Sequence, residues 1–244
     1  MTAIAANPVR LDKALARSGA GSRRVCDQLI IAGRVSVDGV VVTNPLTKVD
    51  PAVTPITVDG SPVDTARDLQ YVVVNKPPGV VATMHDPLGR ACLGDLVGPA
   101  NRGLFHVGRL DAETAGLQIL MNDGALAGRL TARALTRTYL AQLPGPVPPG
   151  LEAQLRAGVV VDGARLGVDD FRVVVSAPRS SMVEISLRET TKRGARRLLI
   201  ALHQPPQRLV CVRVGPVLLG DLEAGRSRSL TEVELHALLQ LARE

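Results

Sequence analysis

The predicted strands of this chain cluster together and do not alternate regularly with helices. Apolar runs and alternation predict strands at 71–75, 137–143, 171–176, 182–188 and 207–214. Helical periodicity predicts helices at 125–134, 151–157, 195–202 and near the C-terminus, where Thr231 and Glu234 form a capping box. A parallel sheet covered by helices requires a strand–helix–strand rhythm. The sequence therefore predicts an α+β fold with a mixed, mainly antiparallel sheet.

The first residues of the chain predict two short helices. Leu11, Ala14 and Leu15 follow the spacing of one helix face, and Gly19 ends that helix. Ser22 is a favourable N-cap for a second helix over residues 23–32. The two helices are predicted to pack against each other in a small module.

A hairpin is predicted to complete this module. Asp38-Gly39 lies between two valine-rich runs and is typical of a two-residue hairpin turn. Asp162-Gly163 predicts a second such turn later in the chain. We expect the small module to span residues 8–62 and a larger domain to span residues 68–244. About 50 residues bury little surface, so we expect support from a neighbour or a ligand.

Basic residues are concentrated in two separated segments. The chain has 29 Lys and Arg against 23 Asp and Glu, a formal net charge of +6. Residues 10–34 hold six bases and two acids, and residues 188–213 hold seven bases and one acid. Cations at a helix N-terminus are unfavourable by about 0.3–1 kcal/mol, and a bound phosphate removes that penalty. The two clusters therefore favour nucleic-acid binding over a merely solvated basic face.

The expected nucleic-acid contacts come from both clusters. They are Arg10, Lys13, Arg17, Arg23, Arg24, Lys192, Arg193 and Arg197. Aromatic residues are rare and comprise Tyr71, Phe105, Tyr139 and Phe171. This scarcity disfavours recognition by rows of stacking aromatic side chains.

Asp111 lies in a turn-prone stretch that can present a reactive carboxylate. It follows Gly108-Arg-Leu, so a guanidinium, that of Arg109, is two residues away. A nearby cation keeps a carboxylate ionised. An ionised carboxylate attacks carbon or acts as a base. Spacing alone nevertheless favours a surface ion pair between Arg109 and Asp111, so the chemical interpretation stays open at this point.

Other catalytic patterns are missing from the sequence. It contains no His-Glu-x-x-His, no phosphate-binding loop, no dinucleotide fingerprint and no Gly-x-Ser-x-Gly. Cys26, Cys92 and Cys211 are far apart and odd in number, which indicates a reducing, intracellular setting. No apolar run approaches the roughly 18 residues of a membrane-spanning helix, and residues 1–7 lack the pattern of a secretory signal. We therefore expect no metal, no cofactor and no membrane, and a cytoplasmic location.

Several segments together resemble the bacterial ribosomal pseudouridine synthases of the RsuA/RluB type. Residues 10–24 and 33–39 are similar to the S4 RNA-binding module. Tyr71-Val-Val-Val-Asn-Lys-Pro-Pro-Gly79 and Thr83-Met-His-Asp-Pro-Leu-Gly-Arg90 are similar to the first strand and following loop of the family's catalytic domain. Gly108-Arg-Leu-Asp-Ala-Glu-Thr-Ala-Gly-Leu117 matches the catalytic signature almost letter for letter. The resemblance extends over residues 9–239.

The resemblance implies an enzyme that isomerises one uridine of ribosomal RNA to pseudouridine. The N-glycosidic bond would break, and the base would rotate and reattach through C5. Asp111 would be the catalytic aspartate, Tyr139 would lie against the target base, and Arg196 would pair with the aspartate. Arg109 would hold the loop or the flipped nucleotide. The implied partner is ribosomal RNA or a ribosomal subunit precursor, and no cofactor is implied.

The chain also departs from the family pattern. Family members usually have Asn-Arg-Gln-[Val/Ile]-Arg-Arg-Met where this chain has Lys192-Arg-Gly-Ala-Arg-Arg-Leu198, so Gly194 replaces an amide side chain. The usual Gly-His-Pro has become His203-Gln-Pro205. These departures keep open a non-catalytic ribosome-binding or assembly factor with the same fold. A hydrolytic RNA glycosidase, which leaves abasic sites, is a third alternative.

Overall fold

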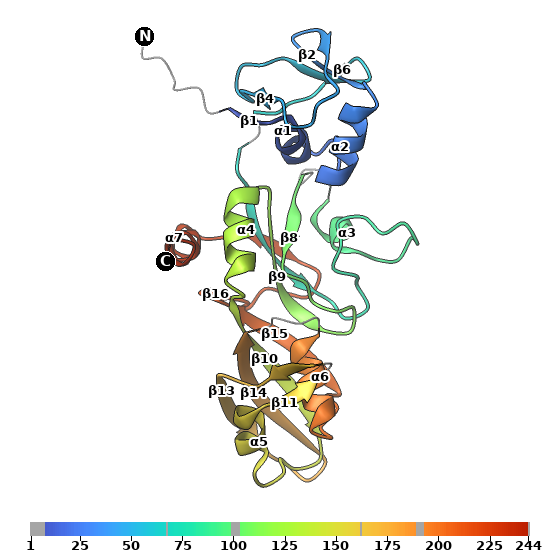
Figure 1. Cartoon of the computed structure of the whole chain (residues 1–244). Helices are drawn as coiled ribbons and strands as arrows, with labels where there is room; N and C mark the ends of the chain where they lie inside the picture. The colour runs from blue at the N-terminus through green and yellow to red at the C-terminus, as the bar shows by residue number, and fades with distance from the viewer. Residues whose placement is uncertain (1–7, 67, 99–102, 162, 189–192, 244) are drawn as a thin grey trace. The chain divides into compact units, whose positions relative to one another are not determined.

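A computed structural model describes residues 8–66, 68–98, 103–161, 163–188 and 193–243 (Figure 1). The chain forms two compact units. The first contains the chain up to Gln70 with short segments around residues 103–105 and Met121–Gly124. The second contains Tyr71–Val97, His106–Leu120 and the chain from Ala125 onward. The domain bounds 8–62 and 68–244 stay a prediction.

The first unit contains the two helices and the hairpin that its sequence predicts. Its helices are α1 (Leu11–Ser18) and α2 (Arg23–Ile31). Its four-stranded antiparallel sheet has the order β3 (Val40–Val41), β2 (Val35–Val37), β5 (Ile56–Val58) and β6 (Ser61–Pro62). A separate pair joins β1 (Val9–Arg10) to β4 (Lys48–Val49).

Local chemistry explains where these elements begin and turn. The hydroxyl of Ser22 accepts a hydrogen bond from Val25 N–H, which satisfies one of the free donors at the start of α2. Asp38 and Gly39 both have positive φ, 51° and 79°, as a two-residue turn between twisted strands requires. Both signals were predicted from the sequence, and the structure confirms them.

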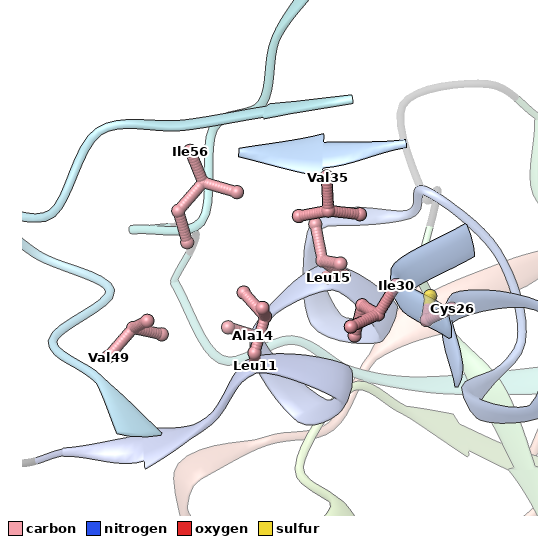
Figure 2. Packing of buried hydrophobic residues seen from close by; sticks show 8 residues of the cluster. All are labelled: Leu11, Ala14, Leu15, Cys26, Ile30, Val35, Val49 and Ile56. Atoms are coloured by element: carbon pink, nitrogen blue, oxygen red, sulfur yellow. The ribbon is translucent and has the colours of Figure 1, made fainter. Parts of the chain in front are cut away.

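The core of the first unit is a small apolar cluster from both helices and the strands (Figure 2). Its fully covered members are Leu11, Ala14, Leu15, Cys26, Ile30, Val35, Val49 and Ile56. Ala14 and Leu15 face the strands because they lie one helical turn from Leu11. The free thiol of Cys26 packs as an apolar group, and burial raises its pKa to about 11.

A buried carboxylate also stabilises the first unit. Asp12 has a side-chain exposure of 0%, and it accepts hydrogen bonds from Arg10 (2.9 and 3.1 Å) and from Arg23 (3.0 and 2.7 Å). Burial alone would raise the pKa of Asp12, but the hydrogen bonds and charges of Arg23 and Arg10 outweigh burial and lower it. Arg10 and Arg23 therefore have a structural partner, which the charge count did not predict.

The second unit is built on a nine-stranded mixed sheet. Its main order is β13 (Asp170–Val175), β14 (Ser180–Arg188), β10 (Thr136–Pro144), β15 (Arg208–Val214), β9 (Ala115–Met121), β7 (Tyr71–Lys76) and β17 (Ser227–Ser229). In addition, β16 (Val217–Leu218) pairs with β15, and β8 (Phe105–Val107) pairs with β9. A separate hairpin joins β11 (Val159–Val161) to β12 (Ala164–Leu166).

Most pairs in this sheet are antiparallel, as expected for the predicted α+β fold. The pairing of β9 with β15 is parallel, through Val210 with Ala115 and Cys211 with Gly116. Gly116 has φ 105°, and a Cβ there would lie 2.1 Å from the carbonyl oxygen of Cys211. Only glycine permits this close approach of the two strands.

Five helices accompany the sheet. They are α3 (Leu93–Val97), α4 (Gly124–Ala132), α5 (Leu151–Ala157), α6 (Gly194–Ala201) and α7 (Glu232–Leu241). The five predicted strands and the three helices predicted with bounds are found within one or two residues of their predicted ends. The predicted C-terminal helix is α7, and its capping box of Thr231 and Glu234 is formed. Strands β8, β9, β16 and β17 and helix α3 were not predicted. Gly163 has φ 79° between β11 and β12, whereas Asp162 of that predicted turn lies outside the described residues.

Among the described residues, every helix is too short or too polar to cross a lipid bilayer.

The buried carboxylate of Asp12 leads to a prediction about stability. Asp12→Asn should destabilise the first unit by about 1–3 kcal/mol, because it removes charge-assisted hydrogen bonds from Arg10 and Arg23. The folded pKa of Asp12 is lower than its unfolded value. This stabilisation is therefore present at neutral pH and is lost as the pH falls through the folded pKa. The measurement is the free energy of opening of the α1 and α2 amides, obtained from hydrogen exchange between pH 7 and pH 3.

The matched control is Asp38→Asn, because Asp38 is exposed in the hairpin turn and has no ion pair within the described part of the chain. This control should keep the acid dependence of the wild type. Equal acid dependence of wild type and Asp12→Asn would contradict the assignment.

Candidate active site

Asp111 lies in the loop between β8 and β9 and is held by a residue of its own turn. Its carboxylate accepts a hydrogen bond from Thr114 N–H on Oδ1 (2.9 Å) and from the Thr114 hydroxyl on Oδ2 (2.8 Å). The side chain is 6% exposed. Both oxygens are therefore fixed by one neighbour, and the carboxylate has one orientation in the loop.

Arg196 approaches the same carboxylate from helix α6. Its Nε lies 3.6 Å from Asp111 Oδ2, and its Nη2 donates to the Thr114 hydroxyl (3.3 Å). The Thr114 hydroxyl thus connects the carboxylate of Asp111 to the guanidinium of Arg196. Asp111 and Arg196 are brought together from sites 85 residues apart in the sequence. This is the pairing that the family resemblance implied.

The surface ion pair between Arg109 and Asp111 that spacing favours is not found. Asp111 is buried, and its ion pair among the described residues is with Arg196. Arg109 instead lines the pocket in front of the acid.

A small pocket opens over the carboxylate of Asp111. It is lined by Arg109, Leu110, Asp111, Thr114, Tyr139, Arg193, Arg196 and Leu209, and it spans about 200 Å³ when its solvent-open mouth is included. Three of these side chains are guanidinium groups, and one is a carboxylate. The pocket is therefore net positive around a single acid, an arrangement that suits an anionic ligand.

Tyr139 reaches the pocket from the centre of the sheet. It lies on β10 between β14 and β15, opposite Ile185 and Cys211, and is 1% exposed. The pairing of β10 with β15 shifts register between Thr138 and Tyr139. Such irregularities re-aim side chains and are common beside active sites. Tyr139 therefore both packs in the core of the sheet and lines the pocket.

Arg193 sits at the mouth of the pocket where α6 begins. It is the N-cap of α6 with φ 61°, a left-handed conformation that is uncommon for arginine. No acidic residue occupies the first turn of this helix. The N-terminal end of α6 and the guanidinium of Arg193 both attract negative charge.

None of the other predicted basic contacts that the structure describes is a lining residue of this pocket. Arg197 follows on α6 and is not among the lining residues, and Lys192 lies outside the described residues. Arg10, Lys13, Arg17, Arg23 and Arg24 belong to the first unit, where Lys13 and Arg24 are exposed.

Lys76 is a site residue that the sequence reasoning missed. It is fully buried at the end of β7, and its Nζ donates to the carbonyl oxygens of Pro77 (3.0 Å), Val80 (2.8 Å) and Ala112 (2.9 Å). Burial lowers the pKa of Lys76 to about 8, while Asp111 and Glu113 act in the opposite direction. Ala112 follows Asp111, so Lys76 fastens the acid's loop to β7.

Thr114 was likewise not singled out. Both residues had a visible signal, since Lys76 closes an apolar strand and Thr114 falls within the catalytic signature. Within the described residues, no group of three or more His, Cys, Asp or Glu side chains could hold a metal ion.

Comparisons with known proteins agree with this geometry. Residues 70–201 match the family model described as RNA pseudouridylate synthase, and residues 9–53 match the S4 domain. An uncharacterized RNA pseudouridine synthase of Mycobacterium tuberculosis is 45% identical over 95% of this chain and 93% of its own length. Ribosomal large subunit pseudouridine synthase B of Bacillus subtilis is 30% identical over 96% of both chains.

A solved structure of a pseudouridylate synthase has the same fold. Its TM-score is 0.64 at 25% identity, and the match covers 94% of this chain and 99% of that one. The expected fold class, an S4 module followed by a mainly antiparallel catalytic domain, is confirmed. The chain belongs to the RNA pseudouridine synthase family and combines its catalytic domain with an N-terminal S4 domain.

Proposed function

We propose that this enzyme isomerises a specific uridine of ribosomal RNA and that Asp111 initiates the reaction. The observation that carries the proposal is the buried carboxylate of Asp111, fixed by Thr114 and Arg196 inside a basic pocket that also contains Tyr139. The relatives named ribosomal large subunit pseudouridine synthase B make large-subunit RNA the first substrate to assay.

The proposed reaction needs positioning rather than an added group. The N1–C1′ bond of the uridine breaks, the base turns, and C5 bonds to C1′, with loss of the C5 hydrogen and uptake of a proton at N1. The base must first leave its stack, which costs a few kcal/mol. In the proposed complex the bound RNA covers the open side of the pocket, which keeps water away from the freed uracil and holds it for reattachment.

Each lining residue has a proposed role in this scheme. Asp111 acts on the ribose, and Arg196 aligns its carboxylate directly and through Thr114. Tyr139 lies against the target base. Arg109 and Arg193 hold the phosphates of the extruded nucleotide.

The first unit, with proposed bounds 8–62, is the RNA clamp, and residues 68–244 form the catalytic domain. Lys13 and Arg24 are exposed, and neither is ion-paired in the portion of the chain that the structure describes. Arg10 and Arg23 contribute while also holding Asp12. Arg17, Lys192 and Arg197 remain proposed RNA contacts. We place the enzyme in the cytoplasm, acting on ribosomal RNA or a subunit precursor.

The enzymatic proposal is favoured over a non-catalytic ribosome-binding factor. The acid, the tyrosine and the arginine of the implied site meet in one pocket despite Gly194 and the other departures. The relatives that match nearly the whole chain are named as synthases.

A tritium-release assay tests the proposed activity. Large-subunit RNA labelled with tritium at uridine C5 should lose tritium with wild type, and Asp111→Asn should lower the rate by about 10²–10⁴-fold, because the nearly isosteric amide has no negative charge. The matched control is Glu113→Gln, which makes the same change at an exposed position two residues away and should retain near-wild-type activity.

Nucleoside analysis of the same reactions separates the alternatives. Pseudouridine is the expected product, whereas free uracil with abasic sites would indicate a glycosidase. Absence of turnover on both subunits' RNA and on assembly intermediates would favour the binding factor.

The proposed clamp predicts a change in the salt dependence of RNA binding. Replacing Lys13 and Arg24 together by Ala should weaken binding and lower the slope of log K against log salt concentration by about 1.4–1.8, since each phosphate contact contributes about 0.7–0.9. These positions are preferred to Arg23 because its loss would also break the contact with Asp12.

Arg34→Ala serves as the control, since Arg34 is exposed and forms an ion pair with Asp59. Its slope should match the wild type. An unchanged slope in the Lys13 and Arg24 double variant would refute the clamp.

A further inference from the structure

We infer that Gln118 is a positioning residue whose side-chain amide fixes the backbone leading into Asp111. This rests on the proposed role of Asp111. Gln118 lies on β9, where all seven residues are buried, and its own exposure is 0%. A buried amide is unfavourable unless its hydrogen bonds are made. The hydrogen-bond partners of the Gln118 amide therefore indicate its role.

The Gln118 side chain forms its hydrogen bonds with backbone atoms of the segment before Asp111. Its Nε2 donates to the carbonyl oxygens of Val107 and Gly108, each at 3.1 Å. Its Oε1 accepts from Leu110 N–H at 3.2 Å. One side chain thus satisfies two acceptors and one donor in a four-residue stretch, and Leu110 is the residue directly before the acid.

Two further side chains hold the same carbonyl groups. His106 Nδ1 lies 2.9 Å from Gly108 O, and Arg137 Nη2 donates to Val107 O at 3.3 Å. Because a carbonyl oxygen only accepts, His106 carries its proton on Nδ1. Burial lowers the pKa of His106, and Arg109 lowers it further, which favours the neutral ring.

The segment also has no room to relax toward the sheet. Gly108 has φ 67°, and a Cβ there would lie 2.1 Å from Arg137 Nη2. The backbone at Gly108 therefore rests directly on the Arg137 guanidinium.

Gln118 holds the part of the loop that precedes Asp111. After Asp111, Thr114 holds the carboxylate of Asp111, and Lys76 holds the carbonyl of Ala112. Gln118 is not one of the residues that line the pocket, and it reaches the pocket wall through its hydrogen bond to Leu110 N–H. Its loss should therefore move the acid relative to Arg196 without removing a contact to RNA.

The test compares Gln118→Leu with Leu120→Ala, a buried change on the same strand. Displacement of a reacting group by about 1 Å costs on the order of 100-fold. We expect Gln118→Leu to lower kcat by about 10- to 100-fold with KM within about threefold of wild type. Leu120→Ala, at a comparable loss of melting temperature, should keep kcat within about threefold.

A second readout does not depend on activity. Amide hydrogen exchange at Leu110 should be faster in Gln118→Leu and unchanged in Leu120→Ala. Wild type and Asp111→Asn are measured in the same assay. Their difference tests the proposed function independently of Gln118. A wild-type kcat in Gln118→Leu would overturn the inference. So would losses of kcat in both variants that match their losses of stability. Unchanged amide exchange at Leu110 in Gln118→Leu would overturn it as well.

Gln118→Glu covers the case in which Gln118→Leu does not fold. An ionised carboxylate would face the carbonyls of Val107 and Gly108, whereas a protonated one donates to one of them. Its kcat relative to wild type should therefore rise as the pH falls from 8 to 5.5. A ratio independent of pH would count against the positioning role.

Discussion

The central constraint in this protein is the almost enclosed carboxylate of Asp111, which needs hydrogen-bond and ion-pair partners. An isolated buried charge is strongly unfavourable, and proteins tolerate one only when it is paired and hydrogen-bonded. Asp111 meets this requirement with two hydrogen bonds from Thr114 and the nearby guanidinium of Arg196. The arrangement around it follows from this need. Lys76 and Gln118 hold the two sides of its loop, and Gly116 lets β9 approach β15 closely enough to carry that loop.

Asp12 shows the same solution used for folding alone. Its carboxylate is fully buried and accepts four hydrogen bonds from Arg10 and Arg23, so its bonding capacity is filled. Asp111 is ion-paired with Arg196, whose Nε is 3.6 Å away, and it borders a pocket with Tyr139 and two further guanidinium groups. The first acid is saturated by protein groups, and the second keeps space for a ligand. That difference distinguishes Asp12, which has a structural role, from Asp111, for which we propose a catalytic one.

The sequence predicts those features that depend on neighbouring residues. Alternation of apolar residues locates β10 and β14, and Ser22, Asp38-Gly39 and Thr231 mark a helix start, a turn and a cap correctly. Strand β9 was missed because it is buried on both faces and shows no alternation. The family resemblance, not spacing, indicated that Asp111, Tyr139 and Arg196 belong together.

Contacts to backbone atoms were beyond prediction from the sequence. Lys76 and Gln118 bond to carbonyl and N–H groups that come together only after the sheet has formed. The pairing of Arg23 with Asp12 joins residues of two different helices, so a count of charges assigned both Arg10 and Arg23 to RNA alone. Polar residues inside otherwise apolar strands were the one usable signal for such contacts.

The most direct measurement is a structure of the enzyme with RNA that carries 5-fluorouridine at the modified position. The account predicts that this nucleotide is turned out of its helix into the pocket, with its ribose against the carboxylate of Asp111 and its base along Tyr139. A target nucleotide that stays stacked in the RNA, or that binds away from Asp111, would contradict it.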